Sequence, residues 1–99
     1  MTGLRREFGK CAEKIAQRLN ELLAADSLWQ ISTFPPLRLH QLTGNRKECY
    51  TVDVDKRFRL LFRPDYSDER MPRSEDGGID KKRVEKVLVL RLMTNETHE

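Results

Sequence analysis

Two short alternating segments near the middle of the chain constrain its fold most strongly. In residues 50–54 and 58–63, apolar side chains recur at every second position, at Tyr50, Val52, Val54, Phe58, Leu60 and Phe62. Polar or charged side chains occupy most of the positions between them. A period of two is typical of strands with one face on a core. Because only Asp55, Lys56 and Arg57 separate the two segments, the sequence predicts a β-hairpin.

The N-terminal segment has the period of an amphipathic helix. Apolar residues recur at helical spacing, at Leu4, Phe8, Cys11, Ile15, Leu19, Leu22 and Leu23. Charged residues, Arg18 among them, fall on the other side. Gly9 costs about 1 kcal/mol relative to alanine inside a helix, so a break there is an alternative to one continuous helix. Asp26 or Ser27 is then expected to cap a short second helix that Pro35 and Pro36 end.

Two further strands are predicted at 37–42 and 84–93, which completes a sheet of about four strands. The last segment, VEKVLVLRLM, is the most apolar, and we expect it to be central in the sheet. Residues 65–82 contain acidic clusters and an Asp-Gly-Gly turn, and are expected to form a mobile loop that shields a basic face or touches a partner. A chain of 99 residues is expected to be one α+β domain, 1–99.

Positive charge is concentrated in the middle of the chain although the net charge is only +3. Residues 38–63 contain seven lysines and arginines against three acids. Such an excess favours a polyanionic partner, with a solvated sheet face as the alternative. Cys11 and Cys49 lack metal-type spacing, no signal peptide is recognised and no apolar run could span a membrane, so we expect a cytoplasmic protein, with Cys11 in the core.

Three blocks of sequence resemble the RelE/ParE superfamily of bacterial type II toxin–antitoxin systems, and within it the HigB-like plasmid-maintenance "killer protein" branch. PPLRLHQLTGNRKECYTVDV resembles that branch's leucine-histidine, Lys-Gly-Asp-Arg and strand pattern, FRLLF its aromatic-arginine strand, and the C-terminal strand ends in His98. EDGGIDKKRV is similar to a loop in a longer branch. The resemblance implies a RelE-like fold, with N-terminal helices packed on a small, mostly antiparallel sheet.

The resemblance also implies an activity. Members of this branch are mRNA interferases that cleave ribosome-bound mRNA, need no metal or cofactor, and are neutralised by a cognate antitoxin. Cleaving RNA in this way requires a base, an acid and cations that stabilise the phosphorane. The matching catalytic positions are Arg59, His98, His40 and Glu96, and contacts to the RNA backbone are implied for Arg46, Lys47, Arg57 and Arg63. Arg59 would stabilise the transition state, the histidines would move protons, and Glu96 would orient His98 or act as base.

Three departures from the family pattern keep other readings open. Thr43 stands where the family commonly has lysine, Thr97 stands where tyrosine precedes the terminal histidine, and the family's first strand has no counterpart before the helix. The alternatives are a catalytically impaired relative that binds RNA or a protein partner, and a gyrase-inhibiting toxin, which needs no histidine. Without the first strand, we expect the sheet to gain an edge from another chain, as a homo-oligomer or with the antitoxin, or the domain to be less stable than relatives that keep this strand.

Without the family, the residues have ordinary explanations. Histidines at a strand end or near a chain end are commonly surface residues. Arg59 would be a solvated strand residue, paired with Asp53 at best. Tyr50 alternates with Val52 and Val54, so core packing is favoured over base stacking.

Overall fold

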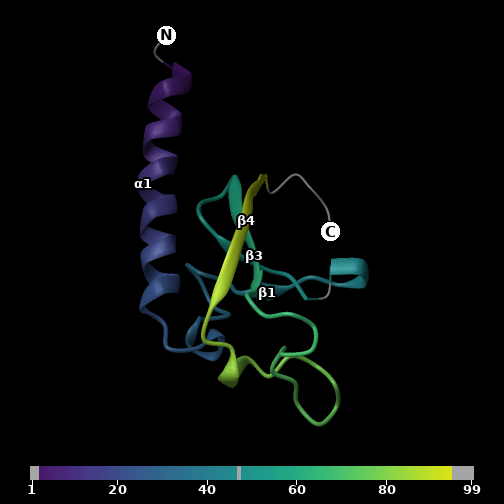
Figure 1. The fold of residues 1–99 in the computed structure, drawn as a ribbon. Coiled ribbons are helices and arrows are strands. Elements are labelled where there is room, and N and C mark those ends of the chain that lie inside the picture. The colour runs from purple at the N-terminus through teal and green to yellow at the C-terminus, as the bar shows by residue number, and fades with distance from the viewer. Residues whose placement is uncertain (1–2, 47, 95–99) are drawn as a thin grey trace.

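One helix lies against a four-stranded antiparallel sheet in the computed structural model, which describes residues 3–46 and 48–94, with side chains from residue 11 onward. The strand order is β1-β2-β3-β4, and the elements are α1 (Gly3–Ala24), β1 (His40–Gln41), β2 (Tyr50–Asp53), β3 (Phe58–Pro64) and β4 (Val87–Thr94). Three short 3-10 helices connect them, η1 (Leu28–Gln30), η2 (Gly44–Arg46) and η3 (Lys81–Arg83). In Figure 1, α1 stands to one side of the sheet. The predicted α+β class is confirmed.

The predicted β-hairpin is formed by β2 and β3. Their register places Tyr50 opposite Phe62 and Asp53 opposite Arg59. The turn is closed by the Asp55 carboxylate, whose Oδ1 accepts hydrogen bonds from the backbone N–H groups of Arg57 at 2.7 Å and Phe58 at 3.0 Å. An aspartate that binds the backbone two residues ahead imitates a turn, so the connection does not need an Asn-Gly pair.

The main core lies between α1 and the near face of the sheet. The rings of Tyr50 and Phe62 stack there with centroids 6.0 Å apart, and Val52 is fully buried beside them. Cys11 and Leu22 reach this core from α1. The core roles predicted for Tyr50 and Cys11 are therefore confirmed. A smaller cluster covers part of the opposite face and consists of Leu42, Leu61 and Met93, with Cys49 at its margin.

Arg18 was expected on the polar side of the helix, and that expectation is wrong. Its residue surface is only 6% exposed. Its Nε donates to the backbone carbonyl of Asp53 at 2.7 Å, and its Nη1 donates to Oε1 of Glu21 at 2.8 Å. Helical periodicity did not predict this contact, because the long side chain of arginine can bury its aliphatic part and still bring the guanidinium to a backbone carbonyl at the helix–sheet interface. Leu23, expected on the apolar stripe, is instead 83% exposed.

The other helical expectations are met in part. The helix α1 runs without a break through Gly9. The short second helix is present as η1 and begins after Ser27, whose side chain makes no capping hydrogen bond. The capping interaction runs the other way, because Oε1 of Gln30 accepts from the backbone N–H of Asp26 at 2.7 Å.

The last strand, β4, is at the edge of the sheet and not at its centre. Only β3 pairs with it among the described strands, and three of its apolar side chains, Leu88, Val89 and Leu90, are 38% to 48% exposed. Phe62 pairs with Val89 while Leu61 pairs with Arg91, which leaves Leu90 as a bulge. The apolar composition of β4 predicted that both of its faces would be buried. The described part of the chain contains only one long helix, however, and this helix covers one face of the sheet. At the other edge, β1 is limited to two residues of the predicted 37–42.

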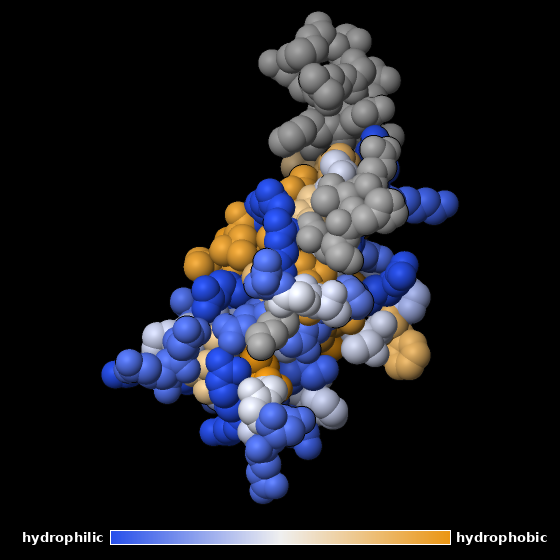
Figure 2. Space-filling model, turned by 90° about the vertical axis from the view of Figure 1, so that its right-hand side faces the viewer, coloured by the Kyte–Doolittle hydropathy of each residue, from blue (hydrophilic) through white to orange (hydrophobic). Residues whose placement is uncertain are grey.

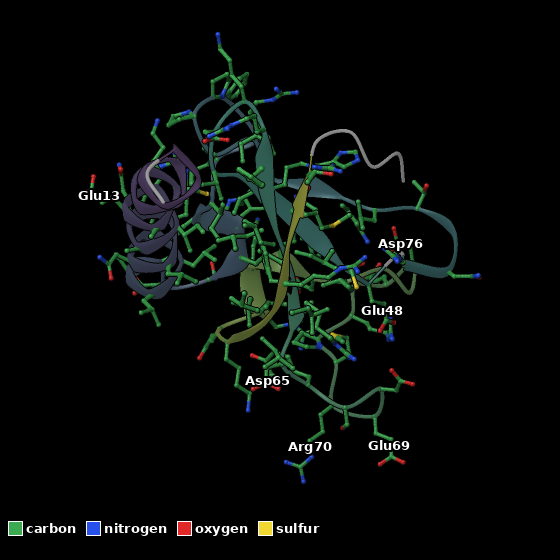
Figure 3. The ribbon with its side chains drawn as sticks, turned by 90° about the horizontal axis from the view of Figure 1, so that it is seen from above. Glu13, Glu48, Asp65, Glu69, Arg70 and Asp76 are labelled. Atoms are coloured by element: carbon green, nitrogen blue, oxygen red, sulfur yellow. The ribbon has the colours of Figure 1, made fainter. Side chains whose placement is uncertain are left out.

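The segment 65–82 carries a hydrogen-bonded turn. Arg73 bridges to Ile79, and Oδ1 of Asp76 accepts from the hydroxyl of Ser74 and the backbone N–H of Gly78. Arg73 also forms an ion pair of 2.8 Å with Glu48, which ties the loop to the β1–β2 connection. Figure 3 shows Glu48 and Asp76 on the side of the domain away from Glu13 of α1. The mobility of this loop stays a prediction.

Replacing Arg18 tests the contact between α1 and β2. We expect Arg18→Ala to lower the free energy of unfolding by about 1 to 3 kcal/mol, because it leaves the carbonyl of Asp53 without this buried donor. The measurement is urea unfolding followed by circular dichroism, with Lys14→Ala, an exposed neighbour on the same helix, as the matched control. Equal stability of the two variants would contradict the structural role of Arg18.

Candidate functional site

The sheet face turned away from α1 carries the two predicted catalytic residues that the structure describes. His40 on β1 lies opposite Thr51, and Thr51 lies opposite Leu61. Arg59 is two residues before Leu61, so both side chains belong to the same face. Strand spacing and rise place their Cα atoms about 12 Å apart. This separation excludes a direct contact between the backbones but lets two long side chains approach one bound group.

Two more arginines share this face. Arg63 follows Leu61 by two residues on β3, and its guanidinium donates to the carbonyls of Pro64 and Tyr66, each at 3.3 Å. Arg91 on β4 lies opposite Leu61 and is exposed. Arg91 had not been singled out from the sequence. The only signal for it is one charged residue within the apolar run VLVLRLM.

The remaining predicted residues lie elsewhere or outside the described part of the chain. Arg57 sits in the hairpin turn, with its guanidinium carbon 5.3 Å from the ring centre of Phe58. Arg46 ends η2 and is half-buried. Lys47, Glu96 and His98 are outside the described residues. The strand that leads toward the last two, β4, ends at Thr94 opposite Phe58, next to Arg59 in the sequence.

A second basic region lies on the other side of the hairpin. An open groove of about 910 Å³ runs between α1, residues 35–38 and the hairpin turn. Five cationic residues line it, Lys14, Arg18, Arg38, Lys56 and Arg57, against the two acids Asp53 and Asp55. Both acids are already engaged, because Asp53 Oδ2 lies 3.4 Å from Nη1 of Arg38 and Asp55 Oδ1 accepts the hydrogen bonds that close the hairpin turn. Of the predicted RNA-binding residues that the structure describes, Arg57 therefore lies in this groove, Arg63 on the sheet face and Arg46 at the end of η2.

Burial raises the pKa of two groups in the core beneath these surfaces, Cys11 and Tyr50. Burial raises the pKa of the Cys11 thiol, and the Asp55 carboxylate adds to this effect while Arg57 opposes it. A protonated, buried thiol is a poor nucleophile, which fits a core role. Burial, with a smaller contribution from the Glu48 carboxylate, raises the pKa of Tyr50 to about 12.

Features of other protein classes are not seen in residues 3–46 and 48–94. No three histidine, cysteine, aspartate or glutamate side chains come together there as metal ligands would. Nor does this part of the chain hold a helix with the length and apolarity that crossing a bilayer demands. Comparison with protein-family models, with curated proteins and with solved structures gave no match to this chain.

The raised pKa of Tyr50 predicts a specific loss of stability in alkali. The unfolded tyrosine ionises near pH 10, whereas the folded one ionises near 12, so the buried neutral phenol contributes stability below about pH 10 and loses it as the pH rises through about 12. Tyr50→Phe should remove this part of the pH dependence. Urea unfolding at several alkaline pH values measures it, with Tyr66→Phe as control. A variant as alkali-sensitive as the wild type would refute the assignment.

Proposed function

We propose that this chain is an RNA-cleaving toxin with a RelE-like fold, of the HigB-like branch, which inhibits translation by cutting ribosome-bound mRNA until a cognate antitoxin neutralises it. The observation that carries the proposal is the common sheet face of His40 and Arg59. Arg63 and Arg91 add positive charge to that face. His40 and Arg59 both lie in the blocks of sequence that resemble the family, and they are the two residues that RNA cleavage needs most.

The chemistry of metal-independent RNA cleavage fits these side chains. A base removes the proton of a ribose 2′-OH, the oxygen attacks the adjacent phosphorus, and an acid protonates the leaving 5′ oxygen. Imidazole serves as base or acid because it titrates near neutrality, so His40 is a proton carrier in this mechanism. Arg59 binds the phosphorane oxygens, since guanidinium donates two parallel hydrogen bonds to phosphate. His98 and Glu96 remain candidates for the second proton transfer.

The groove around Arg57 extends the nucleic-acid surface. Its cations carry no base-specific information, and they would hold the phosphate backbone on either side of the cleaved bond. Arg18 lines this groove but is not assigned to RNA, because its guanidinium already donates hydrogen bonds to Asp53 and Glu21. RNA contacts are therefore assigned to Lys14, Arg38, Lys56 and Arg57.

The runner-up is an RNA-binding or partner-binding relative without cleavage activity. The specific observation in its favour is Thr43, an exposed residue just before η2 that stands in the position of the family's lysine. A missing cation there removes one source of transition-state stabilisation without removing backbone binding. A gyrase-inhibiting toxin is a third reading, and inhibition of DNA supercoiling by the purified protein would identify it.

Arg59→Ala tests the catalytic assignment. We expect cleavage of ribosome-bound mRNA to fall by about a hundredfold to a thousandfold, as when one donor to a developing oxyanion is removed. RNA binding should fall much less, because the groove cations remain. Arg70→Ala is the matched control, since Arg70 is exposed and lies in the loop far from the sheet face in Figure 3. Full activity of a folded Arg59→Ala protein would remove Arg59 from the mechanism.

Thr43→Lys separates the leading function from the runner-up. If the missing cation limits the reaction, restoring lysine should raise the single-turnover cleavage rate while leaving RNA affinity within about tenfold, since one added phosphate contact changes binding only modestly. Wild-type protein that binds RNA but cleaves none, with activity appearing only in Thr43→Lys, would establish the non-catalytic reading.

A further inference from the structure

Within residues 3–46 and 48–94, no strand pairs with the outer edge of β4, and this edge is apolar. The edge strand β4 exposes Leu88, Val89 and Leu90 by 48%, 38% and 44%. Figure 2 shows apolar side chains gathered along one side of the molecule, in contrast to the hydrophilic remainder of that view. Natural proteins usually protect long edge strands with charge, proline or a covering element, because an open edge pairs with other chains. Here the bulge at Leu90 interrupts the edge only at the middle of the strand.

A groove adjoins this edge. Its volume is about 330 Å³, and it is lined by Leu19, Leu22 and Leu23 from α1, by Val84 from the segment before β4, and by Val87 and Val89 from β4. Leu23 is the most exposed of the large hydrophobic side chains that the structure describes, at 83%. An open backbone edge beside an apolar groove is the arrangement that accepts an extended peptide, with main-chain hydrogen bonds for affinity and a pocket for alternate side chains.

The positive charge around the groove favours an acidic binding partner. Residues 80–89 contain four cations, at positions 81, 82, 83 and 86, against two acids, Asp80 and Glu85. Asp80 is engaged by Arg83 at 2.9 Å. The ammonium groups of Lys81 and Lys82 lie 5.4 and 5.0 Å from the ring centre of Trp29, which is itself 58% exposed, so both cations are held at the surface next to the groove.

We propose that the groove between α1 and β4 is a docking site for another protein's extended segment, which adds as a strand beside residues 86–89. That segment has alternating apolar side chains and acidic residues at the end that meets Lys82 and Lys86. Its apolar side chains enter the groove over Val87 and Val89, and its backbone satisfies the open edge. The site lies apart from His40 and Arg59 and does not depend on RNA cleavage.

A second copy of this chain fits the same edge less well. Two copies related by a two-fold axis would pair β4 with β4 and bring two copies of residues 80–89, each with two excess positive charges, into one interface. Like charges placed together across an interface oppose association, whereas an acidic strand is attracted. The bulge at Leu90 also interrupts the ladder that a symmetric antiparallel pair would extend past the middle of the strand.

Peptide binding to the full chain tests the docking site. The probe is a synthetic peptide with blocked termini, Ser-Val-Thr-Val-Thr-Val-Glu-Glu, and the comparison peptide carries two lysines in place of the two glutamates. We expect the acidic peptide to bind about tenfold more tightly at low salt, because the rim is cationic. Lys86→Glu should reduce or reverse this preference. Titration calorimetry measures both affinities.

Substitutions in the groove test whether the peptide binds at this place. Val89→Lys should abolish binding, and Leu23→Ser should weaken it with little effect on folding, since Leu23 is already exposed. Arg70→Glu, a charge reversal in the distant loop, should leave binding unchanged. Binding that ignores Leu23→Ser and Lys86→Glu would overturn the proposal. A protein that elutes as a dimer, becomes monomeric in Val89→Lys and binds neither peptide would assign the edge to a second copy instead.

Discussion

The hydrogen bond from Arg18 to the backbone of Asp53 joins the two layers of this domain. Its donor comes from the middle of α1 and its acceptor from the last residue of β2, where β1 no longer pairs with that strand. A buried guanidinium is costly unless its donors are satisfied, and here a carbonyl and the carboxylate of Glu21 satisfy two of them. The contact therefore holds the helix at one place along the hairpin, and the apolar packing of Cys11 and Leu22 against Tyr50 and Phe62 follows from that placement.

Fixing the helix on one face divides the sheet into two environments. The near face is filled by the stacked rings of Tyr50 and Phe62, whereas the far face has only the small cluster of Leu42, Leu61 and Met93. Alternation along β2 and β3 then sends charged residues such as Arg59 to the face that α1 leaves uncovered. The candidate site is a consequence of this division, because the proposed RNA surface needs cations on a rigid support that the core does not occupy.

The local sequence pattern predicted which helices and strands form better than it predicted what surrounds them in the fold. The hairpin, the long helix and the core position of Tyr50 follow from periods of two and 3.6 residues, which depend only on backbone geometry. The burial of Arg18 and the edge position of β4 depend on partners distant in sequence, which periodicity does not report. Of the candidate site, alternation along residues 58–63 places Arg59 and Arg63 on one face. His40 joins them through the pairing of β1 with β2, and Arg91 only because a bulge at Leu90 resets the register of β4.

That bulge gives β4 two different surfaces. Before it, Val87 and Val89 face the groove beside α1, and after it, Arg91 lies opposite Leu61 on the face of His40 and Arg59. An unbroken strand would place Arg91 on the same face as Val89, since residues two apart share a face. One inserted residue therefore separates an apolar edge suited to protein contact from a cationic face suited to phosphate. Bulges commonly re-aim side chains near functional sites, and here the re-aimed side chain is an arginine.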